Sequence, residues 1–387
     1  MFPDLNVLVK RFDDDFEDKF YSENSHLIKY KTQHFTVELL TEWYSERAIE
    51  IESLTGIVNN SFELIKHGIK NKIPGLEKLY DDFTTFAILV YEIGIIDLQF
   101  DQFKRLNNFE KVKLLMSNAT KNGDQFLVHI KKYLLPFIKL SQKYSKENTN
   151  HLLKDYLVSI AKMDLSLCQK VFENSKLILK QSDKIINNIY DLLEYALACV
   201  YSCQDVNRLD IAFQIVECLP QRNNDKIDEK LTQLCDEVDF LENHLIVVDM
   251  LVQYDSPQTP AYIRDLQLNK DHQGTRNLFI KATRNAAKRD SPLTVNEGIE
   301  LFQNLKEIHD LCFLECIDED EIYEIFVKHL LTSGRKENFA LASSYMQLNS
   351  EIKLKKKVIP FEKSVQVVVS AAQDYINSSN SIQDESI

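Results

Sequence analysis

The residues best suited to bind a metal ion are His309, Cys312 and Cys316, with His329 further along the chain. The first three are spaced i, i+3 and i+7, so they would lie on one face of a helix. Imidazole nitrogen and thiolate sulfur are ligands that zinc prefers in proteins, but structural zinc sites usually hold their ligands in closely spaced pairs. The same spacing is typical of the buried face of a helix. We therefore interpret these four residues as core positions and predict no metal site.

The sequence offers no stronger candidate for catalysis. Cys199 and Cys203, spaced i and i+4, are interpreted in the same way as the first group. Phosphate-binding, dinucleotide-binding, nucleophile-elbow and zinc-protease motifs do not occur in the sequence. The eight glycines are scattered singly, and the carboxylates are too numerous for any acid–base pair to stand out. We predict a protein that is not an enzyme, with no cofactor and no small-molecule substrate.

The elements that would carry these residues are helices. In residues 61–93, apolar side chains recur every three or four positions on both sides of Ile73-Pro74-Gly75. Such periodicity indicates helices, and Pro74 and Gly75 favour a turn between them, so the stretch is predicted to be a helical hairpin. Similar periodicity predicts helices at 32–52, 98–117, 124–144 (bent or interrupted at Pro136), 151–164, 165–176, 187–203, 209–220, 230–254, 275–288, 295–315, 320–332, 336–348 and 361–376.

The composition agrees with a helical fold. Only eight glycines and eight prolines occur in 387 residues, whereas a β-rich protein needs frequent turn residues. Small residues such as Ala196 and Ala212 would let neighbouring helices approach closely. The hairpins recur at irregular intervals of about 30 to 50 residues, without the consensus of a familiar repeat family. We predict an all-α fold, an irregular α-solenoid of stacked antiparallel helical hairpins. A compact helical bundle is the alternative.

The domain organisation predicted from these patterns has three parts. Residues 1–29 form an acidic, weakly ordered N-terminus, and residues 30–378 form the helical solenoid region. A division of that region into two lobes would fall near 221–230 or 255–270, where polar residues and prolines gather. Residues 379–387, rich in serine and polar side chains, are predicted to be a disordered tail.

The net charge and the cysteine content indicate which partners and which cellular compartment to expect. The formal net charge is −13, and the short basic runs 284–289 and 353–357 are interpreted as solvated surface, so no direct nucleic-acid binding is expected. The acidic run 13–18 is interpreted as a solvated terminus or a contact for a basic partner. Seven cysteines without close pairing signals indicate a reducing compartment. No signal peptide or membrane-spanning stretch is predicted, so recruitment to a membrane would require partners.

Several stretches together resemble a known family. They are EWYSERAIEIE (42–52), LIKHGIKNKIPGL (64–76), LVYE (89–92), LLKDYLVSIAKMDL (152–165), IVECLPQR (215–222), YEIFVKHLLTSGRKEN (323–338) and FEKSVQVVVSAAQDYINSS (361–379). In order and spacing they are similar to the helical middle region of the NBAS (neuroblastoma-amplified sequence) family, which is related to the secretory-pathway subunit of the yeast Dsl tether. The resemblance runs from about residue 35 to 380, and its stretches look like packing motifs, so no functional residue is carried over.

The resemblance implies a cytoplasmic α-solenoid scaffold, peripheral on the endoplasmic reticulum membrane, within a multisubunit vesicle tether. Its partners would be other tether subunits and an ER SNARE, and its process would be retrograde Golgi-to-ER transport. Animal members are also connected with nonsense-mediated mRNA decay, so an adaptor in that pathway is the alternative function. The third hypothesis for the function is an unrecognised helical enzyme. Animal members are far longer and begin with a β-propeller that has no counterpart here, so this chain would be a short member or a piece of a longer protein.

Overall fold

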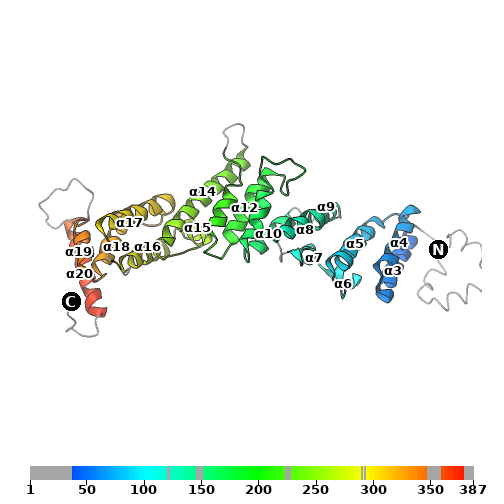
Figure 1. Ribbon diagram of the computed structural model, residues 1–387, viewed down its shortest axis with the longest axis horizontal. Helices are drawn as coiled ribbons and strands as arrows, with labels where there is room; N and C mark the ends of the chain where they lie inside the picture. The colour runs from blue at the N-terminus through cyan, green and yellow to red at the C-terminus, as the bar shows by residue number, and fades with distance from the viewer. Residues whose placement is uncertain are drawn as a thin grey trace, which may run out of the picture. The chain divides into compact units, whose positions relative to one another are not determined.

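The computed structural model describes residues 37–119, 123–144, 151–222, 228–288, 291, 293–346 and 359–378. These residues form an all-α, solenoid-like fold, and no β-strand occurs among them (Figure 1). The predicted fold class is therefore confirmed. Contacts divide the chain into two compact units, Met1–Leu153 and Lys154–Ile387. The predicted N-terminal segment 1–29 and tail 379–387 lie outside the described residues.

Unit 1 contains short helices, three of which run into or out of single π-helical turns. They are α3 (Val37–Thr55), α4 (Val58–Lys70), α5 (Glu77–Ala87), η2 (Ile88–Ile93), α6 (Phe100–Arg105), α7 (Asn108–Leu115), α8 (Gly123–His129), η4 (Ile130–Leu134) and α9 (Leu135–Tyr144). The predicted hairpin is formed by α4 and α5, with α3 packed beside α4 (Figure 1). At the turn, Gly75 has a φ of 81°, a conformation that costs glycine least. The hydroxyl of Thr41 donates to the carbonyl oxygen of Pro74 at 2.8 Å, which ties the turn to α3.

The core of unit 1 is built around four phenylalanines on α5 and α6. Phe83 and Phe100 stack with their ring centroids 3.8 Å apart. Phe86 packs edge-on against Phe100, and Phe103 packs against both Phe86 and Phe100. All four rings are fully buried. Offset and edge-on ring pairs add to the free energy gained from burial, so this cluster fixes α6 against α5.

A buried carboxylate joins α3 to the same cluster. Glu52, only 5% exposed, accepts a hydrogen bond from the backbone N–H of Phe100 at 3.2 Å. That N–H belongs to the first residue of α6, where helical donors have no partner within the helix. Burial raises the pKa of Glu52, although the bond from Phe100 opposes the shift. The carboxylate therefore caps a helix end that water reaches poorly.

Two predicted helices of unit 1 differ from the structure. The single helix predicted over 98–117 is wrong: α6 and α7 are separate, because Leu106 is extended and Asn107 caps α7 by accepting from the N–H of Glu110 at 2.9 Å. The helix predicted over 124–144 does not break at Pro136. The π-helical turn η4 precedes it, and such a turn accommodates the proline ring and its missing N–H.

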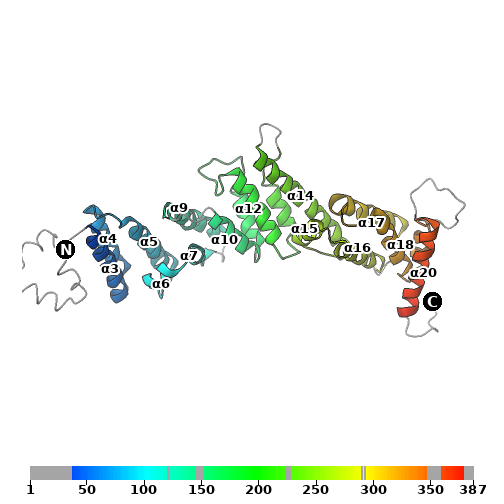
Figure 2. The same cartoon turned by 180° about the vertical axis from the view of Figure 1, so that it is seen from behind.

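Unit 2 continues the helical series from the boundary within α10. Its elements are α10 (Leu152–Ala161), α11 (Leu165–Glu173), α12 (Ile189–Ser202), α13 (Leu209–Val216), α14 (Glu229–Val252), α15 (Pro260–Leu268), α16 (His272–Ala287), α17 (Val295–Ile308), the π-helical turn η6 (His309–Phe313), α18 (Glu319–Leu331), α19 (Lys336–Ser343) and α20 (Phe361–Ser378). Figure 2 shows α12, α14 and α15 side by side, and α16, α17 and α18 likewise.

Second neighbours as well as consecutive helices pack together in unit 2. Helix α11 packs on α13, α12 on α14, α16 on α18, and α18 on α20, whereas the consecutive helices α12 and α13 meet less extensively. This alternation stacks hairpins on one another, as in an α-solenoid. Ala196 on α12 and Ala212 on α13 are both buried, as expected for small residues where helices approach closely.

One helix of unit 2 was not predicted. The sequence predicted a break between helices over 255–270, yet α15 occupies most of this segment. Its start shows why: the hydroxyl of Thr259 accepts from the N–H of Tyr262, and Pro260 takes the first helical position. Proline at that position is favourable, because its missing N–H would have no partner in any case.

Replacing Glu52 tests the buried cap. Glu52→Ala removes the acceptor of the Phe100 N–H, and an unsatisfied buried donor costs about 1–3 kcal/mol of unfolding free energy. Glu52→Gln keeps an acceptor oxygen and removes the charge that burial disfavours, so it should stay within about 1 kcal/mol of wild type at pH 7. Chemical denaturation of the full chain measures both. Equal losses in the two variants would contradict the capping role.

Candidate interaction surfaces

The residues considered as zinc ligands lie in two different places. His309, Cys312 and Cys316 are all at most 5% exposed, and the nitrogens of His309 are engaged: Nε2 lies 2.9 Å from the carbonyl oxygen of Ile317 and Nδ1 lies 2.9 Å from Asp310. His329 faces a groove between α16, α18 and α20. Within the described ranges, no three His, Cys, Asp or Glu side chains are grouped so that they could hold a metal ion. The first three residues pack in the core of unit 2.

The cysteines are core residues. All seven are buried and unpaired. The thiol of Cys168, in α11, donates to the carbonyl oxygen of Leu157 at 3.3 Å. Burial raises the pKa of Cys312 to about 12, and it also raises that of Cys203. Because the thiolate is the reactive form, these thiols are poorly suited to nucleophilic chemistry near neutral pH.

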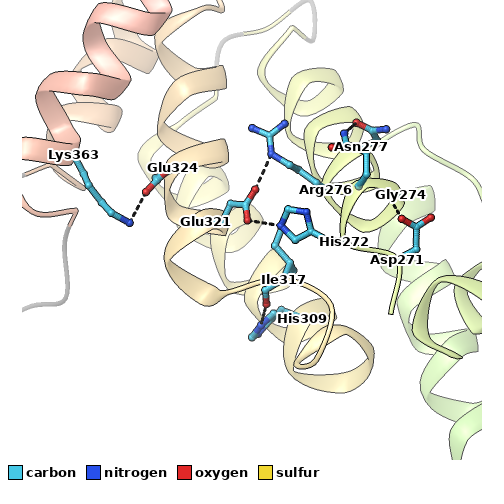
Figure 3. Close-up of polar contacts among 11 residues, drawn as sticks. Asp271, His272, Gly274, Arg276, Asn277, His309, Ile317, Glu321, Glu324 and Lys363 are labelled. Atoms are coloured by element: carbon cyan, nitrogen blue, oxygen red, sulfur yellow. Dashed lines mark hydrogen bonds and ion pairs between the residues drawn. The ribbon is translucent and has the colours of Figure 1, made fainter. Parts of the chain in front are cut away.

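A groove with charged walls runs between α16, α18 and α20 in unit 2. Glu321, at the start of α18, accepts a hydrogen bond from Nε of Arg276 at 2.7 Å, and its other oxygen lies 2.8 Å from Nε2 of His272 (Figure 3). Both partners belong to α16. One carboxylate thus holds two side chains of the neighbouring helix.

The other side of this groove is closed by ion pairs to α20. Lys363 pairs with Glu324 at 2.8 Å (Figure 3), and Lys328 pairs with Asp374 at 2.8 Å. The groove has a volume of about 320 Å³. Ion pairs exposed in this way contribute at most about 1 kcal/mol each. They set the register of the three helices, and they leave the groove walls largely neutralised.

A larger cleft lies in unit 1, with a volume of about 500 Å³. Its walls come from α3, α5, α6, α7 and α9, and they carry three lysines, Lys78, Lys104 and Lys111. Sequence patterns did not indicate this site, since the three lysines lie on three different helices and Lys78 is 26 residues before Lys104. Their proximity is created by the packing of α5, α6 and α7.

Helix α20 carries partly exposed apolar side chains beside the face that it buries. Ser364, Val367 and Ala371 are buried, whereas the next positions around the helix are about half exposed: Val365 46%, Val368 45%, Val369 49% and Ile376 56%. Their spacing of three, four and seven residues places them on one side of the helix. A contiguous exposed patch of this kind is typical of protein contact surfaces.

These features define a class of protein: an all-α solenoid-like chain whose cysteines are buried and unpaired. Comparison with known protein families identifies the family to which the chain belongs. Residues 14–238, more than half of the chain, match the family model described as secretory pathway protein Sec39. The chain therefore belongs to the Sec39 family of secretory-pathway proteins, in agreement with the resemblance found in the sequence.

Two relatives cover almost all of the chain. It is 32% identical over 375 residues to the human NBAS subunit of the NRZ tethering complex, a match that covers 94% of this chain and 16% of the human protein. It is 24% identical over 360 residues to MAG2-interacting protein 2 of Arabidopsis thaliana, covering 90% of this chain and 14% of the plant protein. The chain thus spans about one sixth of the length of these relatives. No solved structure matches it.

No helix in the described segments is both long enough and apolar enough to cross a membrane.

The pH dependence of stability should depend on His329. Burial, with Lys328, Arg284, Lys288 and Arg276 nearby, lowers its pKa from 6.5 to about 4. In the unfolded chain His329 is protonated below about pH 6.5, whereas in the folded chain it is protonated only below about pH 4. Because the unfolded state binds this proton first, the free energy of unfolding falls as the pH is lowered between these values. Between pH 7 and pH 5, wild type should lose about 2 kcal/mol more than His329→Gln. Denaturation curves at both values measure this, and parallel losses would refute it.

Proposed function

We propose that this chain is a non-catalytic scaffold subunit of a vesicle tether that acts in retrograde Golgi-to-ER transport. It would lie on the cytoplasmic side of the endoplasmic reticulum membrane, held there by its partners. Those partners would be other tether subunits and an ER SNARE. The observation that carries the proposal is membership of the Sec39 family, together with 32% identity to a subunit of a tethering complex over 94% of the chain.

The structure supports this proposal through what stacked helices can do. Hairpins that pack on second neighbours hold surface residues from distant parts of the sequence at defined positions. The exposed valines of α20 and the lysine cleft of unit 1 are two such surfaces, one apolar and one charged. Apolar anchors and charge complementarity are the usual sources of affinity and specificity between proteins. A scaffold needs such surfaces and no reactive group.

Affinity capture tests the partners directly. The tagged full chain, incubated with detergent-solubilised endoplasmic reticulum and cytosol, should recover other subunits of one tether and an ER SNARE, identified by mass spectrometry. The tag alone serves as the control. Recovery of mRNA-decay factors without tether subunits would favour the adaptor alternative, and recovery of neither from a folded sample would contradict the scaffold proposal.

Depletion of the protein in the host cell tests the process. If the chain acts in retrieval, an ER-resident reporter ending in Lys-Asp-Glu-Leu should escape into the medium after acute depletion. The half-life of a reporter mRNA with a premature stop codon should stay unchanged. The opposite result, a longer mRNA half-life with the ER reporter retained, would replace transport by mRNA decay as the function.

A further inference from the structure

The lysine cleft of unit 1 contains a cation whose surroundings call for an anion. Lys111, on α7, is only 9% exposed and lies in the wall of the cleft. Its ammonium group sits 4.3 Å from the ring centroid of Phe103. It makes no hydrogen bond or ion pair with another described residue. Charged side chains buried to this extent are normally paired, because removing a charge from water is costly.

The charges around Lys111 do not balance. Lys78 and Lys104 line the same cleft, together with Asp81 and Asp82. Asp81 is already engaged by Lys143 at 3.1 Å and by the hydroxyl of Tyr144. Asp82 interacts with the three lysines through space, without an ion pair to any described residue. Three lysines therefore face one available carboxylate, and the cleft carries an excess of positive charge within a chain whose net charge is −13.

The electrostatic surroundings of Lys111 agree with this geometry. Burial lowers the pKa of Lys111, and the neighbouring Lys78 and Lys104 act in the same direction, while Asp82 opposes them. Keeping Lys111 in its ammonium form therefore costs free energy, and a bound anion would reduce that cost.

We propose that this cleft binds carboxylate side chains of an acidic segment of another tether subunit, with Lys78, Lys104 and Lys111 as the cationic contacts. The proposal rests on the scaffold function proposed above and names the chemistry of one partner surface. Asn108 and Ser141 also line the cleft and can donate hydrogen bonds to a carboxylate or to the backbone of the segment.

The rest of the lining favours a peptide over a free anion. Leu79, Phe137 and Leu140 supply apolar surface next to the lysines, so a segment with both acidic and apolar side chains fits better than phosphate. The lysines are spread over three helices instead of converging as an arginine fork, the arrangement best matched to phosphate. A volume of about 500 Å³ also lies within the range of about 300–1,000 Å³ common for ligand-binding clefts.

Charge removal at the cleft tests the proposal in the capture experiment. The full-chain variant Lys78→Gln/Lys104→Gln/Lys111→Met removes the three cations while methionine keeps an apolar chain over Phe103. Its control, Lys70→Gln/Lys113→Gln/Lys139→Gln, removes three exposed lysines of unit 1 that do not line the cleft. Recovery of one tether subunit should fall about tenfold or more with the first variant, as expected for losing charge-assisted contacts, and stay at the wild-type level with the control.

A zero-length carbodiimide cross-linker identifies the occupant. It joins a lysine to a carboxylate only when the two are in contact, so the captured complex should give amide bonds between the cleft lysines and Asp or Glu residues of one segment of that subunit. The thermal midpoints of both triple variants should stay within about 4 °C of wild type. If the cleft variant unfolds, Lys111→Met alone, scored by the same cross-links at Lys78 and Lys104, replaces it.

The outcomes separate this inference from the scaffold function. Equal recovery with both triple variants would overturn the cleft while the scaffold stands, whereas failure of the wild-type chain to recover any tether subunit would remove the basis of both. Cross-links from the cleft lysines to Asp13, Asp14 or Asp15 would identify the chain's own acidic N-terminus as the occupant and overturn the partner segment. Calorimetric binding of inorganic phosphate, abolished only by the cleft variant and without effect on capture, would identify a small anion instead.

Discussion

The described structure depends on burying the apolar stripe of each amphipathic helix against other helices, because burial of apolar area is the main source of stability. In unit 1 the partners are consecutive helices, as in α3 on α4 and α4 on α5. In unit 2 second neighbours pack as well: α12 on α14, α16 on α18, and α18 on α20. Short loops and small residues such as Ala196 only permit the approach. On α20, Val365, Val368 and Val369 remain about half exposed beside the buried Val367 and Ala371.

Charge is used differently in the two units. In unit 2 the charged residues between α16, α18 and α20 are paired with one another, as Glu321 is with Arg276, so they hold helices in register. In unit 1 the lysines of the cleft face too few carboxylates, and Lys111 is buried without an ion pair to a described residue. A paired surface charge contributes little to affinity for a partner because it has already been neutralised, whereas an unpaired, partly desolvated charge gains when a partner supplies the counter-charge. This difference is why the proposed contact lies in the cleft and not in the larger set of ion pairs.

A scaffold function is consistent with how the reactive residue types are used. The cysteines are buried in the core, and His309 is held by Asp310 and the carbonyl oxygen of Ile317. Family membership extends over most of the chain at modest identity, as is expected when selection acts mainly on packing and on a few surface contacts.

The sequence by itself determined the helical fold class, most helix positions and the family, because apolar periodicity and the ordered series of packing stretches are local properties that survive without coordinates. It failed where local signals were ambiguous: Thr259-Pro260 reads as a break but starts α15, and the stretch around Asn107 reads as one helix but holds a cap. The lysine cleft and the cap on Phe100 by Glu52 were decided by tertiary structure alone. Both bring together residues from helices far apart in the chain, and burial and pairing of charge depend on that packing and not on sequence spacing.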